Sequence, residues 1–82
     1  MDIEIGDWLA SLRGKRSQES IAKAAGIQRT SLTDIENGAY LPTPTTLGKI
    51  LAAMDCDGRL AEGDAILSRC HRERAARKSS AA

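Results

Sequence analysis

Phenylalanine is absent from the 82 residues, and Trp8 and Tyr40 are the only aromatic residues. A core without many aromatic rings has to be built from leucine, isoleucine, alanine and methionine. Small aliphatic side chains of this kind suit short helices that pack closely together. A chain of this length has enough residues for one domain with one modest core, and too few for two.

Cysteine and histidine are also scarce, because Cys56, Cys70 and His71 are the only examples. One pair of cysteines is too few for a disulfide framework, so both thiols are expected to be reduced. The only histidine lies next to a cysteine, which does not give the ligand spacing of a metal site. No nucleophile or carboxylate pair is arranged around His71, so we expect no metal, no cofactor and no enzymatic activity.

The sequence has no signal peptide and no apolar run long enough to cross a membrane, so we expect a cytoplasmic protein of a bacterium or phage. Its net charge is only +1, but the charge is unevenly distributed. Residues 13–29 and 69–78 each carry a net charge of +4, while residues 1–12 carry −3 and residues 30–68 carry −4. Two basic blocks can form one positive face, as nucleic-acid binding requires. For the second block, a solvated tail explains the charge equally well.

Helical periodicity predicts the first three elements. Apolar residues at positions 5, 8, 9 and 12 indicate a first helix with Asp2 as its N-cap and Gly14 at its end. Ser17 is the expected N-cap of a second, two-turn helix that ends at Gly26. A third short helix over residues 28–36 is expected to stop at Asn37 and the glycine that follows it.

Two further helices complete the predicted all-α chain of five helices. Thr43 is the expected N-cap of the fourth, with Pro44 at its first position. Gly63 and Asp64 are the expected start of the fifth, which we expect to fray near residue 76. The predicted organisation is one domain over residues 1–76 and a disordered basic and polar tail over residues 77–82.

The stretch from Gln18 to residue 38 is the most informative. Ala22 lies four residues after Gln18 and Gly26 lies eight after it, while Leu32 and Ile35 follow at fourteen and seventeen. A small residue such as Ala22 lets two short helices cross closely, and Gly26 permits the positive φ that a tight turn needs. With Leu32 and Ile35 as core anchors, this spacing predicts a helix-turn-helix.

The chain resembles the Cro/phage-repressor (XRE-like) type of helix-turn-helix protein. The residues that carry the resemblance are 17–22, Gly26 and 35–38, followed by Pro42 and Leu47. The resemblance covers residues 5–54. It implies a compact, lambda-repressor-like domain whose second motif helix lies in the major groove of double-stranded DNA. The alternative is a helical pair that only packs.

The resemblance assigns base contacts to the outward face of the second motif helix. Arg29 suits a guanine and Gln28 an adenine, although helix capping is an alternative role for Gln28 and Thr30. The expected base-contacting residues are Gln28, Arg29, Thr30, Thr33 and Asp34.

Phosphate contacts are expected around this helix, where they set register and affinity without reading sequence. Relatives of this type use the position of Gln18 both for the DNA backbone and to buttress the reading helix. Relatives often form an ion pair between the residues at the positions of Arg13 and Glu36. The link between residues 13 and 17 is about two residues shorter here, so we state that ion pair as a hypothesis. For the basic residues, ordinary solvated surface is the alternative. The candidates are Lys15, Arg16, Ser17, Gln18, Lys23, Asn37 and Tyr40.

One such domain buries little DNA surface, so we expect a homodimer that reads a palindromic operator. Ile66, Leu67 and Cys70 are the candidates for the dimer interface, and they would equally well complete the monomer core. The function expected first is a transcriptional repressor. The alternatives are an antitoxin that also binds a toxin, with its basic tail as the arm, and an interaction module that no longer binds DNA.

Overall fold

The structure, a computed structural model, describes the backbone of residues 3–81 and the side chains of residues 3–76. Within that range all regular secondary structure is helical and there is no strand. The elements are α1 (Ile5–Arg13), α2 (Gln18–Ala25), α3 (Arg29–Glu36), α4 (Pro44–Ala53), a 3₁₀ turn η1 (Asp57–Arg59) and α5 (Leu60–Ala81). The predicted all-α, five-helix fold is confirmed.

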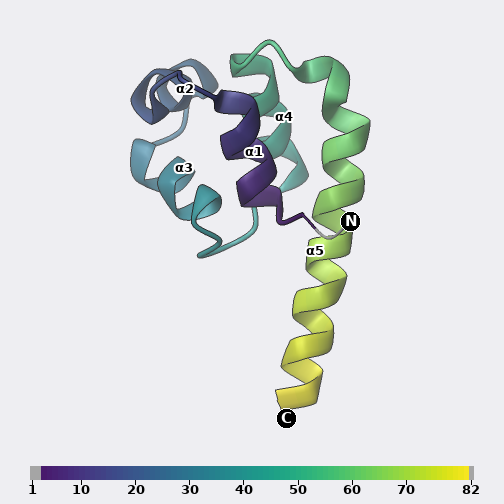
Figure 1. Cartoon of the computed structure of the whole chain (residues 1–82). Helices are drawn as coiled ribbons and strands as arrows, with labels where there is room; N and C mark the ends of the chain where they lie inside the picture. The colour runs from purple at the N-terminus through teal and green to yellow at the C-terminus, as the bar shows by residue number, and fades with distance from the viewer. Residues whose placement is uncertain (1–2, 82) are drawn as a thin grey trace.

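The helices pack around α1 and α4 (Figure 1). The first helix contacts α3 on one side and α5 on the other, while α4 contacts α2 and α5. The second and third helices lie together at one side of the molecule and α5 lies at the other. This arrangement leaves the helix-turn-helix pair at the surface, backed by α1 and α4.

Local signals in the sequence set most helix ends. The Ser17 hydroxyl accepts a hydrogen bond from the Ser20 amide at 3.0 Å, and Thr43 accepts one from the Thr46 amide at 3.2 Å, so both predicted N-caps are confirmed. Pro44 occupies the first turn of α4 as expected. Asp2 lies outside the described residues, and Glu4 holds the N-cap position of α1.

One core joins all five α-helices. Its buried members are aliphatic apart from one tryptophan, one methionine and one cysteine, as the shortage of aromatic residues predicts. They are Ile5, Trp8, Leu9, Ile21, Ala22, Ala25, Leu32, Ile35, Leu47, Ile50, Leu51, Met54, Leu67 and Cys70.

The last helix differs from the prediction at both ends. It begins at Leu60, directly after η1, and Gly63 lies inside it. A Cβ on Gly63 would come within 2.9 Å of the Trp8 ring, so this glycine is present for close packing and does not start the helix. The backbone stays helical to Ala81, beyond residue 76, where we expected fraying. The division into a domain over 1–76 and a tail over 77–82 stays a prediction.

Candidate nucleic-acid interface

The turn between α2 and α3 has the geometry that the sequence predicts. Gly26 follows α2 with φ 74° and ψ 29°, the left-handed conformation that glycine adopts without strain. Its amide donates to the Lys23 carbonyl at 3.2 Å, and the Ile27 amide donates to the Ala22 carbonyl at 3.0 Å. These two bonds form a Schellman motif, which ends α2 and redirects the chain into α3.

The third helix is divided into a buried face and an exposed face. Leu32 and Ile35 are buried in the core. The side chains of Gln28, Arg29, Thr30 and Asp34 are exposed. Four of the five residues expected to contact bases therefore lie in solvent. Gln28 holds the N-cap position of α3, but its side chain makes no capping hydrogen bond, so capping does not occupy it.

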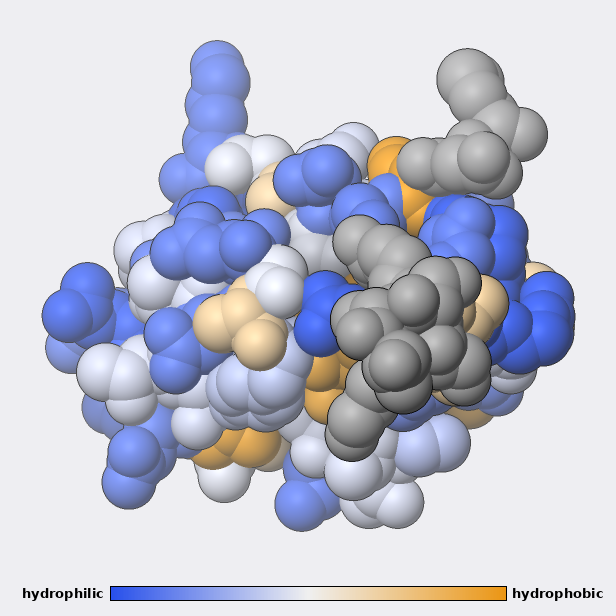
Figure 2. All heavy atoms as spheres, turned by 90° about the horizontal axis from the view of Figure 1, so that it is seen from below, coloured by the Kyte–Doolittle hydropathy of each residue, from blue (hydrophilic) through white to orange (hydrophobic). Residues whose placement is uncertain are grey.

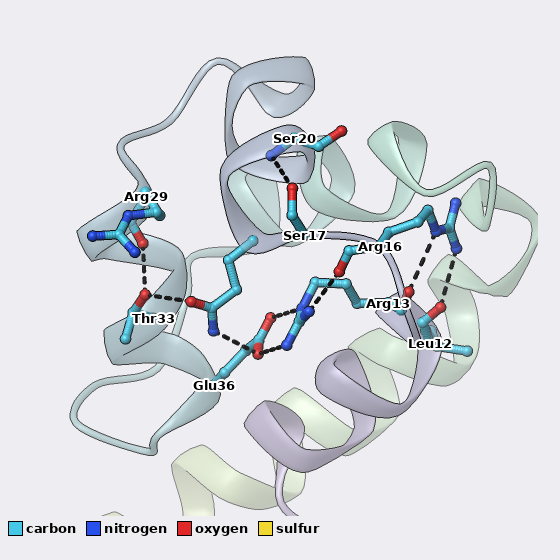
Figure 3. Close-up of polar contacts among 9 residues, drawn as sticks. Leu12, Arg13, Arg16, Ser17, Ser20, Arg29, Thr33 and Glu36 are labelled. Carbon is cyan, nitrogen blue, oxygen red and sulfur yellow. Dashed lines mark hydrogen bonds and ion pairs between the residues drawn. The ribbon is translucent and has the colours of Figure 1, made fainter.

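A hydrogen-bond network lies directly under α3 and ties it to α1 and α2 (Figure 3). The Arg13 guanidinium donates through Nε and Nη2 to the two carboxylate oxygens of Glu36, at 2.8 and 2.9 Å. Gln18 donates to the same carboxylate at 3.0 Å and accepts from the Thr33 hydroxyl at 2.9 Å. The ion pair that we hypothesised between Arg13 and Glu36 is thus present. Gln18 supports α3 through its two hydrogen bonds to that helix.

The ion pair between Arg13 and Glu36 forms although the link between α1 and α2 is short, because the Arg13 guanidinium also donates to the backbone of that link. Arg13 Nη1 donates to the carbonyl of Arg16 at 2.6 Å, which folds residues 14–16 back against the end of α1. The Glu36 carboxylate raises the pKa of Arg13, chiefly through the hydrogen bonds between them. Arg13 therefore stays charged, as the bidentate geometry requires.

Thr33 differs from the other residues expected to contact bases. Its side chain is half-buried, and its hydroxyl lies within hydrogen-bond distance of both Gln18 and the Arg29 carbonyl. Because the hydroxyl proton is donated within the protein, Thr33 could contact a base only through its methyl group or by accepting a hydrogen bond at its oxygen.

Most of the expected phosphate contacts are exposed at the surface. Lys15, Lys23 and Asn37 are exposed, and Tyr40 is exposed with its hydroxyl donating to the Ser31 carbonyl at 3.3 Å. The Ser17 hydroxyl oxygen accepts a hydrogen bond as the cap of α2, which leaves its O–H group able to donate to a phosphate.

Arg16 has contacts within the protein that the sequence did not indicate. Its guanidinium donates to the carbonyls of Leu12 at 3.1 Å and Met54 at 3.1 Å, and more weakly to that of Arg13 at 3.4 Å. These carbonyls lie at the C-terminal ends of α1 and α4, where a cation is favourable. In Figure 3 Arg16 lies across the motif from Arg29. Arg16 thus caps these helix ends with part of its guanidinium, while its side chain stays exposed, so its phosphate contact stays a prediction.

The candidate dimer residues are used in the monomer core. Leu67 is 2% exposed and Cys70 is 1% exposed, while Ile66 packs partly against the same cluster. Of the two alternatives, the structure favours core packing for Leu67 and Cys70, since side chains this deeply buried offer no surface to a second copy. Burial raises the pKa of the Cys70 thiol, whose sulfur lies 3.5 Å from a Glu4 carboxylate oxygen.

Gly6 is a structural determinant of the site that sequence reasoning missed. A Cβ built there would lie 2.4 Å from the Ile35 carbonyl oxygen and 2.7 Å from that of Glu36. The first helix can approach the end of α3 this closely only because Gly6 has no side chain. The one signal in the sequence is a glycine in the first turn of a helix, where glycine is unfavourable.

A close pair of short helices, a left-handed glycine between them and a second helix with a buried inner face and a polar outer face define a helix-turn-helix. A model of the helix-turn-helix family matches residues 9–60. The chain belongs to this family, of the Cro/phage-repressor type, whose members are DNA-binding transcription regulators.

A curated relative supports the same assignment. The "ImmF control region 10 kDa protein" of Bacillus phage phi105 is 50% identical over 40 residues, which cover 49% of this chain and 44% of the relative. The match thus spans less than half the length of that relative. No solved structure matches the chain significantly. Among the described residues, no helix combines the length and hydrophobicity needed to cross a membrane.

Proposed function

We propose that the chain is a transcriptional repressor that inserts α3 into the major groove of a palindromic operator and binds it as a homodimer. The observation that carries the proposal is the exposed polar face of α3, held in place by the network beneath it. Gln28, Arg29, Thr30 and Asp34 are solvated, while Glu36 and Gln18 fix the helix from behind. We place this activity in the cytoplasm, where the DNA of a bacterium or an infecting phage is found.

Arg29 is the residue that we propose as the principal base reader. It lies in the first turn of α3, its side chain is exposed, and a guanidinium can donate two hydrogen bonds to the O6 and N7 atoms of a guanine. Thr30 and Asp34 lie on the same face, where they can reach neighbouring base pairs. Asp34 would accept a hydrogen bond from a cytosine amino group.

The proposed phosphate contacts lie on both sides of this face. Lys15 precedes α2 and Lys23 lies in its last turn, while Asn37 and Tyr40 follow α3. The free amides at the start of α2, next to Gln18, also suit a phosphate oxygen. Contacts of this kind fix the orientation of α3 in the groove and add affinity that falls with salt.

The dimer is proposed because one domain of this size buries too little DNA for tight specific binding. Two copies that each read a half-site about one helical turn apart would supply the missing contacts. Recovery of sites with two inverted half-sites by in vitro selection, together with a sedimentation mass of two chains on that DNA, would support the dimer. A single half-site bound by one chain would exclude it.

The test of base reading combines in vitro selection with three alanine variants. We expect Arg29→Ala to lose about 1–3 kcal/mol on the selected duplex and to relax the preference at one base pair. Lys23→Ala should weaken binding to all sequences alike, with a smaller salt dependence. Lys49→Ala, an exposed residue on α4 outside the proposed surface, is the matched control and should bind as the unaltered chain does. Unchanged selectivity in Arg29→Ala would remove Arg29 from the readout.

The antitoxin interpretation depends on the second half of α5, which extends beyond the other helices (Figure 1). A projecting helix is a suitable arm for a partner protein. However, residues 71–76 offer only alanines as apolar side chains, which is little surface for a stable protein interface. Repression through DNA is therefore the function that we put first.

A further inference from the structure

We propose that the second half of α5 is a second phosphate-binding element, in which Arg72 and Arg74 extend the DNA contact beyond the helix-turn-helix. This inference rests on the proposed DNA binding by α3. It adds a site on an element that lies outside the motif and, beyond residue 60, outside the part of the chain matched by the family.

The first observation is a contact between α5 and the loop that follows α3. Arg74 Nη2 donates to the carbonyl oxygen of Gly38 at 2.9 Å. Gly38 lies directly after Asn37 and two residues before Tyr40, which are the proposed phosphate contacts of that loop. Because consecutive Cα atoms are only about 3.8 Å apart, the guanidinium contacts the same short loop segment that carries both residues. A phosphate bound by this loop would therefore lie within the screening length of the Arg74 charge, about 8–10 Å.

The second observation is the charge of this part of the helix. Residues 69–78 contain five basic residues and one acid. Arg69 is used within the protein, since it donates to the Ile3 carbonyl and pairs with Glu73 at 2.7 Å. That pair neutralises the only acid of the block, so the bases that follow carry the remaining charge. Arg72 is exposed, and Arg74 keeps further N–H groups besides the one on Gly38.

The third observation is the position of the helix. The second half of α5 projects past the end of the bundle on the side of the α3–α4 loop (Figure 1). Seen from that end, the described surface is mostly hydrophilic, and hydrophobic residues appear only as small separate areas (Figure 2). From Arg74 to Ala81 an α-helix rises by about 10 Å, which is the length of roughly three nucleotide steps along one strand.

The second half of α5, called the arm below, suits a DNA backbone better than it suits a second copy of the chain. Two basic arms would repel each other, and the exposed residues of this part include no large apolar side chain that could offset the repulsion. Phosphates instead match arginine in charge and in hydrogen-bond geometry. Arg74 would contact the strand that the α3–α4 loop contacts, whereas Arg72, about 200° away around the helix axis, would bind a phosphate on the opposite side of the arm. Neither residue would read a base.

The salt dependence of the DNA affinity reports how many phosphates the arm contacts. The affinity of the whole chain would be measured between 50 and 200 mM salt on a mixed-sequence 30-base-pair duplex and on a duplex recovered by selection. The slope of log affinity against log salt changes by about 0.9 for each phosphate contact. We expect Arg72→Gln and Arg74→Gln each to make the slope shallower by about 0.9, and the double variant by about 1.8, on both duplexes and with no change in sequence preference.

Arg59→Gln is the matched control. It removes one exposed arginine just before α5, roughly 20 Å from Arg74 along the helix axis, and should leave the slope unchanged. Arg72→Gln controls for an indirect effect of breaking the hydrogen bond between Arg74 and Gly38, because Arg72 takes no part in that bond. An unaltered slope in both arm variants, while the unaltered chain still prefers its selected site, would overturn this inference and leave the proposed function standing. Absence of DNA binding by the unaltered chain would overturn both.

Discussion

The ion pair under α3 allows the sharpest prediction about stability. The Glu36 side chain is only 5% exposed, and its carboxylate accepts three hydrogen bonds, two from Arg13 and one from Gln18. Glu36→Gln keeps the size of the side chain, removes the charge and replaces one acceptor oxygen with an NH₂ group. That group would face a donor of Arg13 or Gln18, and the guanidinium would lose its counter-charge.

The expected loss follows from burial. Removing one partner of a fully buried pair costs about 3–5 kcal/mol. Arg13 keeps 19% of its side chain exposed, so water can solvate part of the guanidinium and the cost is lower. We expect Glu36→Gln to lower the free energy of unfolding by about 2–3 kcal/mol, with a fall in melting temperature of roughly 10–20 °C.

A double-mutant cycle separates the pair from other effects of the substitution. Urea unfolding followed by circular dichroism would compare Arg13→Gln, Glu36→Gln and the double variant, and we expect a coupling energy of about 2 kcal/mol. The control is the cycle of Arg59 and Glu62, whose bonds are equally short at 2.6–3.0 Å but whose side chains are 47% exposed. Its coupling should stay below about 1 kcal/mol. Equal coupling in the two cycles would refute the argument from burial.

Two further predictions concern packing and pH. Gly6→Ala should destabilise the chain by about 1–3 kcal/mol, because its Cβ would press on the Ile35 carbonyl. Gly48→Ala, in open space on α4, should stabilise it by about 0.5–1 kcal/mol. If thermal melting ranks the two variants the other way, the close contact of α1 and α3 is wrong. For Cys70, the folded pKa is raised by burial, so the native state keeps the thiol proton longer than the unfolded chain does. Stability should therefore be complete below the ordinary thiol pKa of about 8.5 and decline as pH rises from there through the folded value. Unfolding measured from pH 7 to 10 should show a smaller decline in Cys70→Ala, and an identical decline would contradict the assignment.

Features that depend on neighbouring residues in the chain were predictable from sequence. The caps at Ser17 and Thr43 and the left-handed turn at Gly26 each satisfy the backbone within a few residues, so residue type alone indicates them. The exposed face of α3 was predictable for a similar reason, since Leu32 and Ile35 define its inner side.

Features that depend on contacts between distant elements were not predictable. Gly63 has the local pattern of a helix start, and only the Trp8 ring above it shows that it serves packing inside α5. Nothing near Arg16 in the sequence indicates that its guanidinium donates to the carbonyl of Met54, 38 residues away. Periodicity equally could not decide between core and interface for Leu67 and Cys70, because both kinds of burial select the same residues.

The central claim, that α3 reads the major groove, is tested most directly by methylation interference on a selected duplex. Methyl groups on guanine N7 project into the major groove, and those on adenine N3 project into the minor groove. We predict that N7 methylation blocks binding at two clusters about one helical turn apart and that N3 methylation within those clusters leaves binding intact. Interference from the minor groove alone would contradict the account.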